Sequence, residues 1–241
     1  MILFISDLHL SPARPTITKA FLDFLGKQAQ GADALYILGD FFDAWIGDDD
    51  DTPDYTTIRH ALKAYSRSGT ALYFMHGNRD FLLGEDFIAS TGAKLLSDPT
   101  VITLAGDNTL LMHGDSLCTQ DTDYMAFRDM VRNATWQATL LQQPLQERKA
   151  LAAQLRETSE SMNSMKAEDI MDVTPAEVVA KMHKHQCSRL IHGHTHRPKR
   201  HPTPIDGKTG ERIVLGDWHE QGWYLLAKGA TLELVSFPID G

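Results

Sequence analysis

Short apolar runs recur through the first half of the chain. Residues 2–5 (ILFI), 35–38 (LYIL), 72–75 (LYFM) and 109–112 (TLLM) are such runs, and a Gly, Asp or His follows each within two positions. Four-residue apolar runs that end at a turn residue are typical of strands buried in the interior of a sheet. The pattern therefore predicts four buried strands.

Helical periodicity fills the gaps between the first three runs. Between the first two, apolar residues recur at i, i+4, i+7 and i+8, namely Ile17, Phe21, Phe24 and Leu25. Between the next two, they recur at i, i+4 and i+7, namely Ile58, Leu62 and Tyr65. Both spacings place apolar side chains on one face of a helix. Alternating strands and helices predict the α/β class, with helices covering a sheet.

The pattern changes at about residue 121. Residues 121–186 lack strand signals and are rich in helix formers, whereas strand signals resume at 189–191, 212–215, 222–226 and 231–236. We therefore predict a core made of residues 1–120 and 187–241, with a helical insertion, or cap, over residues 121–186.

Composition narrows the possible functions. The chain has 241 residues, a net charge of −9 and two cysteines, Cys118 and Cys187. The negative charge disfavours binding to nucleic-acid phosphates, so we expect no nucleic-acid partner. No apolar run reaches the roughly 18 residues of a spanning helix. The start, MILFISDLHL, lacks the basic region of a signal peptide, and two cysteines give no disulfide framework, so we expect a cytosolic location.

Residues that can bind metals follow five of the predicted strands. The segments are Asp7-Leu8-His9, Gly39-Asp40-Phe41-Phe42-Asp43, Gly77-Asn78-Arg79-Asp80, His113-Gly114-Asp115 and His192-Gly193-His194-Thr195-His196. The Asp-x-His and Gly-Asp-x-x-Asp motifs are weak when taken alone, since Gly-Asp pairs are common in turns. The closely spaced histidines of His-Gly-His-Thr-His are a stronger signal, because packing rarely needs them. Sites in α/β proteins gather at the carboxyl ends of strands, so five such motifs in sequence predict one shared site.

The donor types indicate the metal. Carboxylate, imidazole and amide donors without thiolate suit Mn²⁺, Fe²⁺, Co²⁺ or Zn²⁺. The donors outnumber those that one tetrahedral ion uses, so two ions sharing a bridging carboxylate are expected, with Asp40 as the bridge. The acidic run Asp48–Asp51 is interpreted as a solvated loop and not as a metal site.

The ordered motifs D-x-H, G-D-x-x-D, G-N-x-D, H-G-D and G-H-x-H resemble the calcineurin-like metallophosphoesterases. The resemblance implies an αββα sandwich whose dinuclear metal centre generates a hydroxide for attack at phosphorus. It assigns one metal to Asp7, His9, Asp40 and His196, and the other to Asp40, Asn78, His113 and His194. His192 lies outside the motif, and we interpret it as a residue that orients a neighbour.

The expected catalytic residues are Asp40, Asn78, Arg79 and His113. Many members of the superfamily have a His at the position of Arg79, and that His can protonate the leaving group. Arg cannot give up a proton near neutral pH, although its planar fork suits two phosphate oxygens. This difference favours a phosphate leaving group, as in a pyrophosphate. Three further carboxylates are expected to orient metal ligands: Asp43, Asp80 and Asp115.

Longer stretches resemble one subgroup, the pyrophosphohydrolases that act on UDP-2,3-diacylglucosamine. They are LYILGDFFDAWIGDD, YFMHGNRDFLLG, MHGDSLCTQD, YMAFR, IMDV and LIHGHTHRP. The resemblance implies a UDP-linked diacylated glucosamine as substrate, with 2,3-diacylglucosamine 1-phosphate and UMP as products, in lipid A biosynthesis. It also implies two Mn²⁺ per chain and peripheral binding to the cytoplasmic face of the inner membrane.

The same resemblance implies contacts to the substrate. The expected residues are Asn78, Arg79, Asp121, Ser159, Asn163, Lys166 and His194. Ser159, Asn163 and Lys166 are spaced i, i+4 and i+7 and would share one helix face. Apolar residues of the insertion, among them Trp136, Leu140 and Leu151, are expected to form a slot for the acyl chains. Alternatively, they pack the insertion on the core.

Two other functions remain open from the sequence. One is a metallophosphoesterase that acts on a soluble nucleotide, whose substrate would need no apolar cap. The other is a non-catalytic binding module of the same fold, although degenerate members of such families usually lose metal ligands and this chain keeps the full set.

Overall fold

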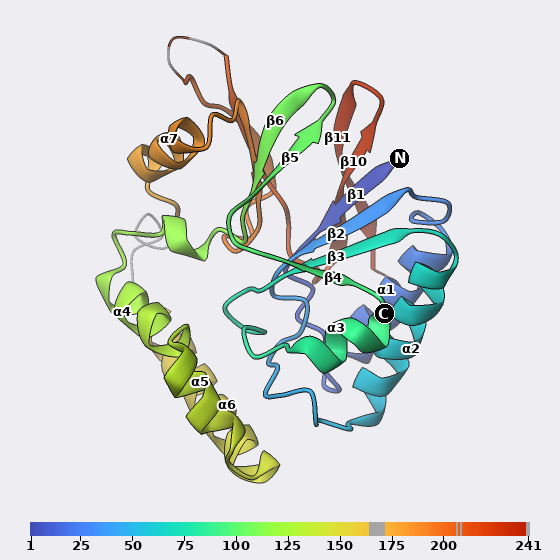
Figure 1. Cartoon of the computed structure of the whole chain (residues 1–241), viewed down its shortest axis with the longest axis vertical. Coiled ribbons are helices and arrows are strands. Elements are labelled where there is room, and N and C mark those ends of the chain that lie inside the picture. Colours follow the sequence, from blue (N-terminus) through green and yellow to red (C-terminus); the bar gives the residue numbers. More distant parts are fainter. Residues whose placement is uncertain (164–171, 206, 208, 240–241) are drawn as a thin grey trace.

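The computed structural model describes residues 1–163, 172–205, 207 and 209–239. Two sheets pack face to face, and helices cover their outer sides (Figure 1). The first sheet has the order β11-β10-β1-β2-β3-β4, and the second has the order β5-β6-β7-β9-β8. The predicted αββα sandwich is confirmed.

The first sheet is parallel in its centre. Its strands are β1 (Ile2–Ile5), β2 (Ala34–Leu38), β3 (Ala71–Met75), β4 (Lys94–Leu96), β10 (Gln221–Lys228) and β11 (Thr231–Pro238). Strands β1 to β4 run parallel, while β10 pairs antiparallel with β1 and with β11. All five residues of β2 are buried, as expected for a parallel strand covered on both faces.

Three helices cover the outer face of this sheet. They are α1 (Pro15–Gly26), α2 (Pro53–Arg67) and α3 (Glu85–Thr91). The predicted apolar stripes point inward, so that Phe21 and Leu62 join a core with Leu35 and Phe74 of the sheet. This core fixes the positions of the loops that leave β1, β2 and β3.

The second sheet packs on the other face of the first. Its strands are β5 (Thr100–Leu104), β6 (Asp107–Leu111), β7 (Arg189–His192), β8 (Lys199–Pro202) and β9 (Glu211–Val214). Leu111, Ile191 and Ile213 meet Tyr36 and Met75 of the first sheet in a shared core. Strands β6 and β7 are parallel, so their carboxyl ends lie on one edge.

In its described residues, 121–163 and 172–186, the insertion contributes four helices, α4 (Thr122–Val131), α5 (Ala134–Leu141), α6 (Leu145–Asn163) and α7 (Pro175–Lys184). Helices α4, α5 and α6 project together from the sandwich, whereas α7 lies beside the second sheet (Figure 1). Val178 and Met182 of α7 pack with Leu110 and Leu190 of that sheet. Helix α7, which the prediction assigned to the insertion, therefore packs on the second sheet as part of the sandwich. The sequence did not separate it from the cap helices, because no strand signal lies between α6 and α7. The division into domains stays a prediction.

Some elements escaped the sequence analysis. Strand β4 has three residues, α3 has seven, and β8 reads Lys-Arg-His-Pro. Edge strands such as β8 often carry Lys and Pro, which protect an unpaired edge but hide the strand pattern. Within the described ranges, no helix has both the length and the apolar character needed to cross a bilayer.

Candidate metal centre

The loops after β1, β2, β3, β6 and β7 converge at one edge of the sandwich. Backbone hydrogen bonds join them, from Asp7 N to Gly39 O (3.1 Å), from His9 N to Asp40 O (3.0 Å) and from Gly193 N to His113 O (2.8 Å). The two sheets therefore bring their motifs together as the strand-end argument predicts.

Among the residues that the structure describes, two groups of metal-capable side chains lie at this edge. Asp7, His9 and His196 form one, and Asp40, His113 and His194 form the other; within each group the donor atoms lie within 4.8 Å of one another. Asn78 joins the second group, because its Oδ1 lies 3.0 Å from His113 Nε2 and 2.8 Å from His194 Nδ1. The structure thus assembles all seven predicted metal ligands.

The backbone of the metal groups is unusual. Positive φ values occur at Asp7 (57°), His9 (50°), Asp40 (50°), His194 (67°) and His196 (54°). Non-glycine residues rarely adopt this conformation, which costs on the order of 1 kcal/mol or more each. Such strain persists where the surrounding fold imposes it, typically at functional sites.

Two glycines allow the carboxylates to approach the backbone closely. A Cβ on Gly77 would lie 2.1 Å from Asp40 Oδ1, and one on Gly193 would lie 2.2 Å from Asp7 Oδ2. Any side chain at either position would displace a predicted ligand. This explains why glycine stands in both motifs.

The electrostatics of the two groups fit divalent cations. Burial, together with the nearby Asp80 and Asp7 carboxylates, raises the pKa of Asp40 to about 7. Burial lowers the pKa of His9 and brings that of His194 to about 4, so both imidazoles are neutral, the form that binds metals. His9 Nε2 lies 3.2 Å from His196 Nε2, beside the Asp7 carboxylate. Cations would neutralise the carboxylates and satisfy the facing nitrogens.

The pKa of His113 is shifted in the opposite direction. Burial alone lowers its pKa, but the carboxylates of Asp40 and Asp115 outweigh burial and raise it to about 9. Its Nδ1 lies 2.9 Å from the Leu38 carbonyl, so Nδ1 carries the hydrogen and Nε2 faces Asp40 at 3.5 Å. This tautomer leaves Nε2 available as a metal donor once it is deprotonated.

Further carboxylates hold the motif loops in place. Asp80 accepts hydrogen bonds from the backbone N–H groups of Gly77 (2.7 Å), Phe41 (2.8 Å) and Asp40 (3.3 Å). Asp115 accepts hydrogen bonds from Arg128 Nε (2.8 Å) and from the Tyr124 hydroxyl (3.0 Å). Asp80 thus joins the loops after β2 and β3, and Asp115 joins the metal-site loop to α4.

His192 lies outside both metal groups. It is fully buried, its Nδ1 lies 2.8 Å from Gly193 O, and its Nε2 lies 3.3 Å from Arg212 Nη1. Burial and Arg212 lower its pKa to about 3, so it is neutral. It supports the backbone next to His194.

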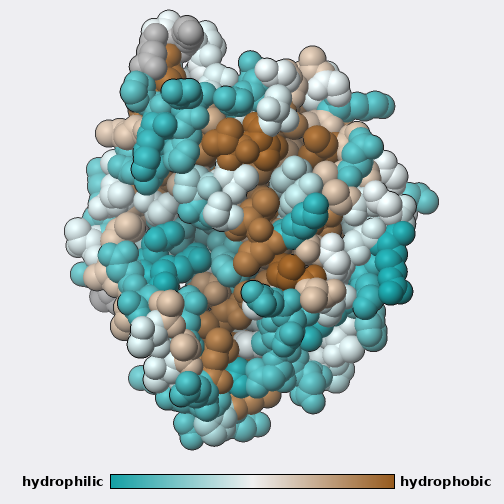
Figure 2. Space-filling view, in the orientation of Figure 1, coloured by the Kyte–Doolittle hydropathy of each residue, from teal (hydrophilic) through white to brown (hydrophobic). Residues whose placement is uncertain are grey.

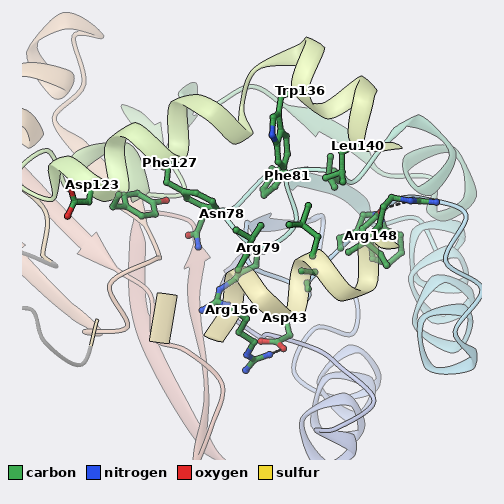
Figure 3. Close-up of a pocket in the computed structure, with 18 residues that line it drawn as sticks. Asp43, Asn78, Arg79, Phe81, Asp123, Phe127, Trp136, Leu140, Arg148 and Arg156 are labelled. Atoms are coloured by element: carbon green, nitrogen blue, oxygen red, sulfur yellow. Dashed lines mark hydrogen bonds and ion pairs between the residues drawn. The ribbon is translucent and has the colours of Figure 1, made fainter. Parts of the chain in front are cut away.

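A cavity of about 190 Å³ lies between the cap helices and the loops after β2 and β3 (Figure 3). Its polar lining includes Asp43, Asn78, Arg79, Tyr124 and Arg156. Its apolar lining comprises Ala44, Trp45, Ile46, Phe81, Leu82, Phe127, Trp136, Leu140, Leu151, Ala152 and Leu155. The polar part of the lining adjoins the second metal group through Asn78. The part beside Phe81 and Leu140 is mainly apolar, and Arg148, which lines it as well, is paired with Asp49.

The predicted substrate contacts occupy different places. Asn78 and Arg79 line the cavity, and His194 lies in the second metal group. Asp121 is the N-cap of α4 and accepts a hydrogen bond from Tyr124 N (3.1 Å). The side chains of Ser159 and Asn163, and the whole of Lys166, fall outside the described residues. Sequence reasoning missed Trp45, Phe81, Arg148 and Arg156, although Trp45 closes the segment GDFFDAW.

Comparison with known proteins identifies the family. The family model described as calcineurin-like phosphoesterase matches residues 1–198. The chain belongs to this family. It is also similar to proteins named UDP-2,3-diacylglucosamine hydrolase. The one from Cellvibrio japonicus is 59% identical over 98% of this chain and 99% of the relative. The one from Marinobacter nauticus is 56% identical over 93% of this chain and 92% of the relative. The one from Pseudomonas aeruginosa PAO1 is 54% identical over 99% of this chain and 99% of the relative.

Proposed function

We propose that this metal-dependent hydrolase cleaves the pyrophosphate bond of UDP-2,3-diacylglucosamine, releasing UMP and 2,3-diacylglucosamine 1-phosphate. The observation that carries the proposal is the cavity, whose charged part adjoins the metal groups and whose remaining lining is mainly apolar. That arrangement matches a diphosphate next to two acyl chains. The names of the relatives that share more than half of its residues support the same substrate.

Two divalent cations, Mn²⁺ in our proposal, would lower the pKa of an attacking water molecule and neutralise charge on the phosphoryl oxygens. Asp7, His9, Asp40 and His196 would hold one cation, and Asp40, Asn78, His113 and His194 the other. Asp80 and Asp115 keep the loops that carry these ligands in position through their hydrogen bonds.

Arg79 has two roles at the polar end. Its backbone N–H donates to Asp40 Oδ1 at 2.8 Å, which orients the predicted bridging ligand. Its side chain lines the cavity, where a guanidinium can bind two phosphate oxygens at once. Because Arg does not release a proton near neutral pH, the departing group must be stable as an anion, as a phosphate is.

The apolar end would bind the acyl chains. Trp136 of α5 contacts Phe81, with ring centroids 6.2 Å apart (Figure 3). Leu140 of α5 and Leu151 and Leu155 of α6 add to the same lining. A soluble nucleotide would leave this apolar surface unused. The cavity therefore favours a lipid substrate over a soluble one.

We propose that the cap faces the cytoplasmic leaflet of the inner membrane, where an acylated substrate resides. The cap exposes Met130 (44%) and Leu141 (43%), and apolar surface also runs down the face seen in Figure 2. Residues 122–166 carry six Lys or Arg against five Asp or Glu, in a chain whose net charge is −9. Arg148, one of these six, is buried and paired with Asp49, and the rest of the segment is still less acidic than the chain as a whole. Together with the exposed apolar side chains, this charge balance favours an anionic leaflet.

The activity is tested with purified protein, with and without Mn²⁺, on UDP-2,3-diacylglucosamine, UDP-glucosamine and diadenosine tetraphosphate. We expect Mn²⁺-dependent release of UMP, with kcat/KM about 100-fold higher for the acylated substrate. Asp40→Asn serves as the inactive control. Equal rates on the three compounds, or preference for the dinucleotide, would favour the soluble-nucleotide function. Isotopically labelled water, followed into UMP or into the sugar phosphate, identifies the phosphorus that is attacked.

Membrane binding is tested by flotation with vesicles that contain phosphatidylglycerol. The variant Met130→Glu/Leu141→Glu should lose binding. The variant Leu95→Glu is the matched control, because Leu95 is equally exposed (44%) but lies on β4, away from the cap. Equal loss in both variants, or binding that survives in the cap variant, would contradict this orientation.

A further inference from the structure

Helix α6 holds the loop after β2 through a buried arginine. Arg148, only 3% exposed, donates from Nη1 to Asp49 Oδ1 (2.8 Å) and to the Ile46 carbonyl, and from Nη2 to Asp49 Oδ2. Its Nε donates to the Gln143 carbonyl (3.0 Å). One guanidinium thus joins α6, the turn before α6 and the loop. We call the pairing of Arg148 with Asp49 and Ile46 O the clamp.

The backbone conformation at Gly47 leaves room for the Arg148 guanidinium. Gly47 has φ of +136°, and a Cβ there would lie 2.2 Å from Arg148 Nη1. The next residue faces the opposite way, because Asp48 accepts hydrogen bonds from Trp45 Nε1 (2.9 Å) and from two backbone N–H groups of residues 84 and 87 around the start of α3 (3.0 and 2.8 Å). The acidic run therefore ties the loop to the core with one residue and to the cap with the next.

The clamp joins two walls of the cavity. Leu151, Ala152 and Leu155 follow Arg148 at i+3, i+4 and i+7, so they share its face of α6 and line the cavity. Trp45 and Ile46, directly before Gly47, line the opposite wall. Figure 3 shows Arg148 at the end of the cavity beside Leu140, and Arg156, further along the same helix, beside Asp43.

We propose that Arg148 is a positioning residue that determines selectivity for acylated substrates. The clamp fixes the separation between the α6 wall and the loop wall, and thereby the width of the apolar slot; this inference rests on the function proposed above. The hydrogen bonds of Arg148 go to Ile46, Asp49 and Gln143, none of which belongs to the predicted metal ligands. Loosening the clamp should therefore weaken substrate binding more than it slows the chemical step.

The test compares Arg148→Met, Arg148→Lys and Asp49→Asn with the wild type, and uses Lys149→Ala as the matched control. Lys149 is the next residue on α6, is 41% exposed, and pairs with Asp50 at 3.4 Å. For UDP-2,3-diacylglucosamine we expect KM to rise about tenfold in Arg148→Met, with kcat changed by less than about threefold. Arg148→Lys should not restore KM, since an ammonium group lacks the planar fork.

A substrate without acyl chains separates selectivity from general damage. The loss of kcat/KM for bis(4-nitrophenyl) phosphate should be at least about fivefold smaller than the loss for the acylated substrate. Parallel losses on both substrates, a fall confined to kcat, or full rescue by Arg148→Lys would overturn the proposal. If Arg148→Met does not fold, Asp49→Asn and Gly47→Ala decide the matter, because each disturbs the clamp from the loop side.

Direct binding separates failure of this inference from failure of the proposed function. A wild-type protein that leaves UDP-2,3-diacylglucosamine intact would defeat the proposed function. The clamp is then judged with cis-parinaric acid, a fluorescent fatty acid, whose Kd should rise about tenfold in Arg148→Met and Asp49→Asn but not in Lys149→Ala. Equal Kd values in all variants, or no binding by the wild type, would overturn the clamp proposal itself.

Discussion

Asp80 offers the sharpest test of how the metal-site loops are held. Its buried carboxylate accepts hydrogen bonds from Gly77 N at 2.7 Å, Phe41 N at 2.8 Å and Asp40 N at 3.3 Å. A hydrogen bond to a charged group contributes about 1.5–3 kcal/mol, so the two shorter bonds predict a loss of about 3–6 kcal/mol in Asp80→Ala. For a chain of this length, that loss lowers Tm by about 6–24 °C.

The assay is urea unfolding followed by circular dichroism, in EDTA so that cation binding does not contribute. Asp80→Asn keeps one acceptor oxygen and should lose about half as much free energy. Asp51→Ala is the control, because Asp51 is exposed. It should change the free energy of unfolding by less than about 0.5 kcal/mol. A loss below about 1 kcal/mol in Asp80→Ala would show that these hydrogen bonds do not hold the loops together.

Three further predictions concern cations, the cap and the cysteines. Mn²⁺ at about 100 times its Kd should stabilise the protein by about 2.7 kcal/mol per site, or about 5–10 °C in Tm, and Asp40→Ala should abolish the shift; an unchanged Tm in wild type would contradict the metal site. Arg128→Met removes a 2.8 Å hydrogen bond to buried Asp115 and should cost about 2 kcal/mol in urea unfolding, whereas a neutral result would show that the cap does not support this loop. Burial, with Asp115 and Asp172 nearby, raises the pKa of Cys118 to about 12, and burial also raises that of Cys187. Iodoacetamide at about pH 8 should therefore label both thiols only after unfolding, as mass spectrometry can check, and rapid labelling of the native protein would refute their burial.

The convergence of the metal-capable side chains was predictable because each motif directly follows an apolar run. Once ILFI, LYIL and LYFM are taken as parallel strands, Asp7, Asp40 and Asn78 must emerge at one edge of a sheet. His113 and His194 follow from the same argument on the second sheet. The structure brings these residues together, while their roles as ligands remain predictions.

The contacts between the cap and the core were not predictable. Arg148 and Asp49 are 99 positions apart, and nothing local in either segment indicates the partner. The interpretation of Asp48–Asp51 as a solvated loop was wrong for Asp48, which holds the loop to α3, and for Asp50, which is buried and accepts hydrogen bonds from Thr52. Such pairings depend on how the folded elements meet, which hydrophobic periodicity does not encode.

The hold of α6 on the loop after β2 has a consequence for building chimaeras from related enzymes. If residues 121–163 of this chain were moved alone into a related enzyme, the transferred helix would lie over the loop of the recipient. Arg148 would then lose its partners, the Asp49 carboxylate and the Ile46 carbonyl. Residues 43–50 and the helical segment form one transplantable unit in space, although about 70 residues of chain separate them. Under the clamp proposal, both segments have to be exchanged together to transfer lipid preference from one scaffold to another.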